Sequence, residues 1–99
     1  MVIRFEELQF KDEGTVGHYP IQEHQRSFKH FAYRIVTPER PFGPHAHKGD
    51  EIWFILKGKA KVDLGGKMFE VEENDLIICP EGVSHGMTSD GEVHWLCIG

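Results

Sequence analysis

The chain has 99 residues, of which 39% are hydrophobic and 27% charged, and its formal net charge is −5. This length suits one domain, and a domain so small often needs a metal, disulfides or a second copy to supplement its core. The acidic balance argues against nucleic acid, which binds to basic surfaces, and no apolar run has the length of a membrane span.

The beginning of the chain and its cysteines bear on the compartment. Residues 1–7 carry acidic side chains where a secretory signal would have a basic and then an apolar stretch. The two cysteines, Cys79 and Cys97, are too few for a disulfide scaffold. We therefore expect a cytoplasmic protein in which both thiols are reduced and buried.

The first half of the chain contains few clear elements. Residues 1–27 are polar and lack helical spacing, so we expect an edge strand and loops there, attached to a core that spans residues 28–99 of a single domain, 1–99. Residues 28–37 are rich in aromatic and β-branched side chains and predict a strand that stops at Pro38. The prolines and glycine of residues 38–44 predict a stiff, irregular connection.

The second half predicts short strands separated by turns. Residues 52–56 form an apolar run, and Ala60–Leu64 alternates between apolar and polar side chains. The Gly65-Gly66 pair after it predicts a two-residue hairpin, in which Val62 faces Phe69, Ala60 faces Val71 and Lys61 faces Glu70. Further strands are expected at Leu76–Cys79 and Val93–Ile98. This succession of short strands predicts an all-β sandwich or barrel.

Three histidines and a glutamate have the spacing of a metal site. His45 and His47 alternate, so an extended backbone would turn both rings to one face. Lys48-Gly49-Asp50 suits a tight turn that would return Glu51 to the histidines, and His85 follows a Pro- and Gly-shaped turn. Imidazoles with one carboxylate suit Fe, Mn, Ni, Cu, Co or Zn.

The spacing of these residues resembles the two motifs of the cupin superfamily. The first motif matches His45-x-His47, three residues, Glu51, six residues and Gly58, and the second matches Pro80-x-Gly82, two residues and His85. Three motif positions depart from the pattern without removing a ligand; they are Glu39 and Asn74 in place of glycines, and Ser89 in place of asparagine. Asn74 can adopt the positive φ that a turn glycine provides.

The resemblance implies a cupin jelly-roll (double-stranded β-helix) barrel that holds one divalent transition-metal ion with His45, His47, Glu51 and His85. It also implies that homodimers are common. The apolar outer face of residues 52, 54 and 56 must be covered, either by the N-terminal segment or by a second copy, and we expect a homodimer.

Several other side chains are candidates for the pocket. Trp53 and Ile55 alternate with Glu51 and are expected to line the cavity beside the metal, whereas Met87 lines it or fills a gap in the core. Four further strand residues would line it only if they face inward: His30, Tyr33, Cys79 and His94. In the turns, we expect Glu81 to face solvent and Asp50 to bond its own turn backbone.

Fold does not determine the reaction, because function depends on the site carried by the scaffold. We expect a metalloenzyme acting on a small polar metabolite, as a dioxygenase or an isomerase. Two alternatives remain: a small-molecule-binding or sensor domain without turnover, and a structural metal clamp.

Overall fold

The computed structural model describes residues 1–99 and consists almost entirely of β-strands. Its single helical segment, the 3₁₀ turn η1, spans Phe5–Glu7. Nine strands follow: β1 Val16–His18, β2 Phe31–Val36, β3 Phe42–His45, β4 Glu51–Lys57, β5 Ala60–Leu64, β6 Lys67–Val71, β7 Leu76–Cys79, β8 His85–Thr88 and β9 Val93–Ile98. No helix has the length and apolar character needed to cross a bilayer.

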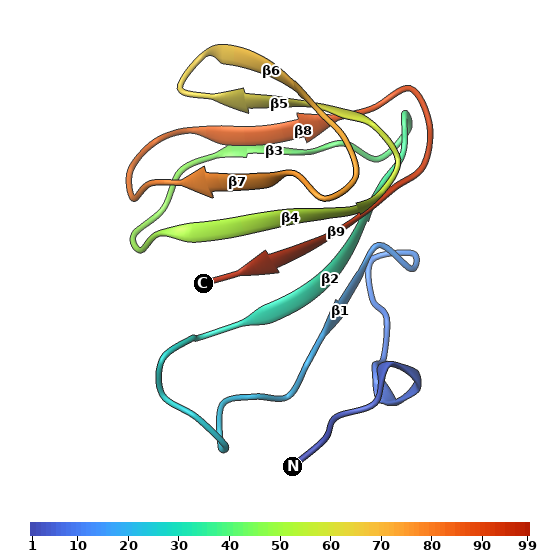
Figure 1. The fold of residues 1–99 in the computed structure, drawn as a ribbon, viewed down its shortest axis with the longest axis vertical. Coiled ribbons are helices and arrows are strands. Elements are labelled where there is room, and N and C mark those ends of the chain that lie inside the picture. Colours follow the sequence, from blue (N-terminus) through green and yellow to red (C-terminus); the bar gives the residue numbers. More distant parts are fainter.

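The strands form two antiparallel sheets that face each other (Figure 1). One sheet has the order β1-β2-β9-β4-β7 and the other the order β3-β8-β5-β6. Strands that are neighbours in a sheet are often distant in sequence, as β2 is from β9 and β3 is from β8. This arrangement is the jelly-roll barrel expected from the sequence.

A core of thirteen buried residues fills the space between the sheets. Alternation along each strand decides which residues enter it. On β4, Trp53 and Ile55 are fully buried, whereas Ile52, Phe54 and Leu56, which alternate with them, are half-buried on the outer face. On β9, Val93, Trp95 and Cys97 are buried in the same alternating way. The inner face of β4 begins with the carboxylate of Glu51, so the core leads directly to the candidate site.

The β5–β6 hairpin has the predicted register. Val62 pairs with Phe69, Ala60 with Val71 and Lys61 with Glu70, across the Gly65-Gly66 turn. Burial is uneven, however, because β6 lies at the edge of its sheet: Val62 is fully buried, whereas Phe69 is largely exposed. The hairpin therefore contributes one inner strand, β5, and one edge strand, β6, to the four-stranded sheet.

Two of the nine strands were not predicted. The stretch expected to be an irregular connection contains β3, which pairs with β8 through an irregular register. His85, which was expected on a turn, is the first residue of β8.

Asn74 has a φ of +73°, as expected for a residue that replaces a turn glycine. Gly58 has a φ of +94°, and a Cβ there would lie 2.6 Å from the carbonyl oxygen of Glu92.

The N-terminal segment covers one end of the five-stranded sheet. Phe5 and Phe10 pack on Tyr33, with ring centroids 4.9 and 5.9 Å away. The segment lies beside β1 and β2 and does not extend to β7 (Figure 1). On β7, Leu76 and Ile78 are 58% and 51% exposed. The outer face near β7 therefore has no cover from this chain.

Candidate metal centre

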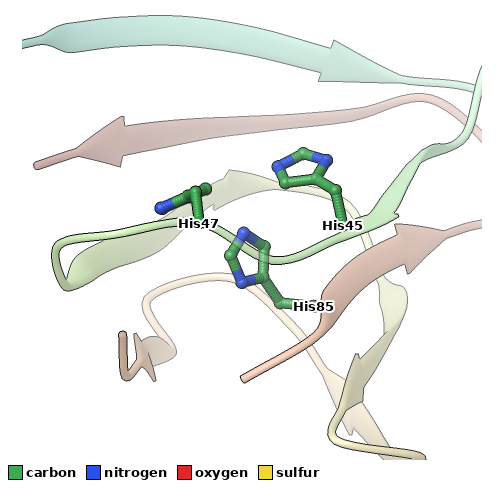
Figure 2. A group of neighbouring side chains, drawn as sticks. All are labelled: His45, His47 and His85. Carbon is green, nitrogen blue, oxygen red and sulfur yellow. The ribbon is translucent and has the colours of Figure 1, made fainter. Parts of the chain in front are cut away.

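Three elements bring the three histidines and the glutamate together. His45 ends β3, and His47 lies two residues further in the β3–β4 loop. Glu51 begins β4, and His85 begins β8. Figure 2 shows the three imidazole rings grouped in one region, with His45 at the end of β3, His47 further along the same chain and His85 on β8. The site thus draws on both sheets, since β3 and β8 belong to one sheet and β4 to the other.

The distances are those of a compact ligand set. The ring centroids of His45 and His47 lie 4.7 and 4.8 Å from that of His85, and one nitrogen of each ring lies within 4.8 Å of the others. Oε2 of Glu51 lies 3.1 Å from Nε2 of His47, and its Oε1 lies 3.7 Å from Nε2 of His85. Adjacent ligand atoms bound to one ion at about 2.0–2.2 Å lie roughly 3 Å apart, so small movements of these side chains would bring them to metal-binding distances, and the cluster is able to hold an ion.

The backbone sets the tautomer of two of the rings. Nδ1 of His47 lies 3.0 Å from the carbonyl oxygen of Lys48, and Nδ1 of His85 lies 3.0 Å from that of Val83. A carbonyl oxygen only accepts, so each Nδ1 must carry the proton and donate it. Each Nε2 then presents a lone pair, and both Nε2 atoms are buried without a hydrogen-bond partner. Such second contacts are typical of metal-binding histidines.

Glu51 is held as a carboxylate in a buried position, with 6% of its surface exposed. Burial alone would raise its pKa. The Trp53 indole donates a 3.0 Å hydrogen bond to Oε1, the Cys97 thiol donates another to the carboxylate, and His47 and His30 lie close by. These contacts outweigh burial and hold the pKa of Glu51 below its usual range. An ionised carboxylate is the form that binds a metal.

One side of the site is open to solvent. His45 is an exposed residue and the side chain of His47 is 32% exposed, whereas His85 is buried. Partial burial, followed by the neighbouring His85 and His47 rings, lowers the pKa of His45. A lowered pKa favours the neutral ring, which is the form that can bind a metal.

Two residues beside Glu51 were not among the predicted ligands. Nε2 of His30 lies 3.2 Å from Oε2 of Glu51 and 3.6 Å from Sγ of Cys97. Burial and the Glu51 charge raise the pKa of the Cys97 thiol, which is therefore protonated. His30 was a pocket candidate only if it faced inward, and it does, because it shares the inner face with Ala32 and Val36, both fully buried. Glu51 is thus shared between the three histidines and a second cluster.

Hydrogen bonds join the loop that carries His47 to the loop that precedes His85. Oδ1 of Asp50 accepts a 2.8 Å hydrogen bond from the backbone N–H of Glu81, and Oε1 of Glu81 accepts one of 2.8 Å from that of Gly49. The N–H of Gly82 donates to the carbonyl of His47 at 3.0 Å. Asp50 was expected to bond its own turn and Glu81 only to face solvent. The expectation for Asp50 is wrong, because its side chain bonds the other loop. Glu81 is exposed as expected, but its carboxylate also bonds the other loop.

The remaining pocket candidates divide by the direction in which they face. Trp53 packs edge-on against the His85 ring, with centroids 5.2 Å apart, whereas Ile55 and Met87 are buried within the core cluster. Cys79 is fully buried, and burial followed by the Glu51 charge raises its pKa to about 12.

Tyr33 and His94 lie on the outer face, where the Tyr33 hydroxyl and Nδ1 of His94 are 2.6 Å apart. They therefore lie outside the candidate site. A surface hollow of about 830 Å³ lies beyond the far end of β8 and contains none of the predicted ligands.

Comparisons with known proteins agree with this architecture. A family model described as a cupin domain matches residues 32–99, and no curated protein matches the sequence. A predicted oxalate decarboxylase from Thermotoga maritima superposes with a TM-score of 0.80 at 22% identity, over 99% of this chain and 96% of that one. A Cupin 2 conserved barrel domain protein from Salinispora arenicola CNS-205 superposes with a TM-score of 0.79 at 21% identity, over 99% of this chain and 87% of that one. At these identities, the structural likeness concerns the fold alone.

Proposed function

We propose that this chain, which belongs to the cupin family because the cupin domain model matches residues 32–99, binds one divalent transition-metal ion and uses it to act on a small polar molecule. The proposed ligands are His45, His47, Glu51 and His85. The observation that carries the proposal is the pair of buried Nε2 atoms, on His47 and His85, that have no partner and adjoin a buried carboxylate. Buried polar atoms without a partner are rare unless something binds them.

The exposure of His45 and His47 favours a metal site that can bind a ligand or substrate over a purely structural metal site. Structural metal sites are closed on all sides, whereas reactive ones keep a position for water or substrate. Here the side of the site formed by His45 faces solvent. A small molecule could therefore approach the ion, which supports an enzyme or a ligand-binding module.

The chemistry that a bound ion supplies is polarisation of a substrate oxygen and, for a redox-active metal, reaction with O₂. The chain's own residues orient the site. The carbonyls of Lys48 and Val83 hold two rings by Nδ1, and Trp53 holds the carboxylate of Glu51. His30, which is partly exposed and lies 3.2 Å from Glu51, offers Nε2 as a proton acceptor or donor between that carboxylate and solvent.

A dioxygenase-type oxidation and an isomerisation of a small polar metabolite both use a metal with an open position. We propose these as the reaction classes. The alternative within the same site is binding without turnover, as in a sensor domain. The two are distinguished by incubating metal-loaded protein with candidate metabolites and measuring both thermal stabilisation and product.

We also propose that the protein is a homodimer. The outer face of β4, β7 and β9 is apolar, and the N-terminal segment packs on Tyr33 of β2 instead of covering it. Exposed apolar patches of this kind are typical of contact surfaces. A two-fold axis would place the same face of a second copy against it.

Metal content tests the ligand assignment. Wild-type protein loaded with each of Fe, Mn, Co, Ni, Cu and Zn should retain one equivalent of at least one metal after dialysis, measured by mass spectrometry. His47→Ala should weaken affinity beyond the roughly 10–100-fold loss typical of removing an outer-shell partner. His24→Ala is the matched control, because His24 is an exposed histidine outside the site. Equal occupancy in both variants would refute the assignment.

A further inference from the structure

Arg34 on β2 faces the inside of the barrel without a partner. It alternates with Ala32 and Val36, which are fully buried, so its side chain shares their inner face. Its guanidinium carbon lies 4.6 Å above the centroid of the Phe42 ring. No carboxylate of the chain forms an ion pair with it, and its Nε is buried without a hydrogen-bond partner. Arg34 as a whole is half-buried, and stacking on an aromatic ring offsets part of the cost of removing this charge from water but leaves the buried Nε–H without an acceptor.

A second buried donor without a partner lies next to Arg34. Trp95 is directly opposite it in the β2–β9 pairing, and its ring centroid lies 6.0 Å from the guanidinium carbon. Trp95 is 0% exposed, yet its indole N–H has no acceptor. The other tryptophan, Trp53, is satisfied by Glu51. Because both groups only donate, the acceptor that this pair lacks must come from outside the chain.

A cavity of about 110 Å³ adjoins both residues, between β2 and the start of β3. Its lining consists of Thr15, Arg34, Ile35, Val36, Arg40, Pro41, Phe42 and Trp95. Arg40 is already paired with Glu13, so the uncompensated positive charge of the cavity is that of Arg34. The volume holds roughly three or four groups of the size of water, at ~30 Å³ each.

We propose that this β2–β3 pocket binds the carboxylate of a small organic acid. The planar fork of a guanidinium matches a carboxylate in a bidentate arrangement, and the indole N–H supplies a further donor. The walls from Val36, Pro41 and Phe42 are apolar, which suits a short carbon chain. Inorganic phosphate would need donors around all of its oxygens.

The β2–β3 pocket is separate from the candidate metal centre. None of the four proposed metal ligands lines it. Phe42 lies between the two sites. Its ring contacts the Arg34 guanidinium, and its centroid lies 4.7 Å from that of the His45 ring. Carboxylate binding at Arg34 therefore requires no metal, and the test is made on metal-free protein.

The two indole N–H groups provide the measurement. Metal-free protein labelled with ¹⁵N-tryptophan, from which the chelator has been removed, should give two indole signals, and Trp95→Phe assigns them. Sodium acetate should shift the Trp95 signal saturably, whereas sodium chloride at the same ionic strength should not. The Trp53 signal should stay in place, because its N–H is already bonded to Glu51.

Variants test the role of the charge. Arg34→Met keeps the length of the side chain and should weaken acetate binding by about tenfold or more, since it removes charged hydrogen bonds. Arg40→Met, at the same cavity but already paired with Glu13, is the matched control and should change binding less. Far-UV circular dichroism verifies the fold of each variant.

The proposal would be overturned by no saturable shift of Trp95 with acetate, by an equal shift with chloride, or by unchanged binding in Arg34→Met. Tighter binding of phosphate than of acetate would also overturn it, because the pocket would then recognise a different anion. If Arg34→Met does not fold, the wild-type comparison of acetate, phosphate and chloride still decides. Metal content has no bearing on any of these outcomes.

Discussion

Two of the three histidines of the candidate metal centre, His47 and His85, are oriented by their own local backbone. His85 bonds the carbonyl two residues before it, and His47 bonds that of the next residue. Neither bond depends on a distant element, so each ring is fixed once its own loop is formed. The lone pairs are thus arranged before any ligand arrives, which lowers the free energy needed to organise the site on binding.

The ionisation of Glu51 makes a prediction about acid stability. The folded-state pKa of Glu51 lies below its ordinary value of 4.5, so the carboxylate stabilises the metal-free fold above that pH. This stabilisation is lost as the pH falls below 4.5 and through the folded pKa. Glu51→Gln should therefore flatten the decrease in Tm over that pH range.

Thermal unfolding of metal-free protein at a series of acidic pH values measures this effect. The control is Glu73→Gln, a change at an exposed glutamate that makes no side-chain hydrogen bond. An equally steep decline in wild type and Glu51→Gln would contradict the link between Glu51 and acid stability.

At the scale of elements, the reciprocal bonds of Asp50 and Glu81 hold the two ligand-bearing loops together. Glu81→Ala removes the acceptor for the Gly49 N–H and should lower the free energy of unfolding by about 0.5–1.5 kcal/mol. It should also weaken metal binding, because the loop of His47 loses a restraint. Urea unfolding and metal titration measure the two effects, with Glu73→Ala as the control. A loss of stability with unchanged metal affinity would show that the bond does not position the ligands.

The turn after β4 depends on the absence of a side chain at Gly58. Its φ of +94° and the nearby Glu92 carbonyl both exclude a Cβ. Gly66 has a similar φ, +91°, but a Cβ there would meet nothing within 4 Å. Gly58→Ala should therefore cost about 1–3 kcal/mol more than Gly66→Ala, the difference being steric overlap. Chemical denaturation of both variants gives the comparison, and equal costs would exclude the overlap as the cause.

Strands rich in apolar and β-branched side chains were predictable from the sequence, and strands that contain Gly, Pro and His were not. Ala60–Leu64, Leu76–Cys79 and Val93–Ile98 have the predicted bounds. β3 contains Gly and Pro, β8 contains Gly, and neither has an alternating apolar pattern. They form because they pair with each other across forty residues and because β8 also pairs with β5. The four proposed ligands could be selected by their spacing. Cys97 could not, because it approaches Glu51 only through the β4–β9 pairing.

At the scale of the whole molecule, the uncovered face of β7 predicts self-association. Ile78→Lys places a charge in this apolar face and should shift the proposed dimer to monomer in sedimentation velocity. Met68→Lys is the matched control, because Met68 is 57% exposed on β6 of the other sheet. A wild-type protein that stays monomeric at all concentrations would refute the dimer.

The division of the metal ligands between the two sheets has a kinetic consequence. His45 and His85 belong to strands of the four-stranded sheet, and Glu51 belongs to a strand of the five-stranded one. An ion bound to all of them would connect the two sheets at that end of the barrel. Such a link would oppose separation of the two sheets at that end of the barrel, although the ion itself could leave through the solvent-exposed side formed by His45. Backbone amides of β4 and β8 should therefore exchange hydrogen more slowly in metal-loaded than in metal-free protein.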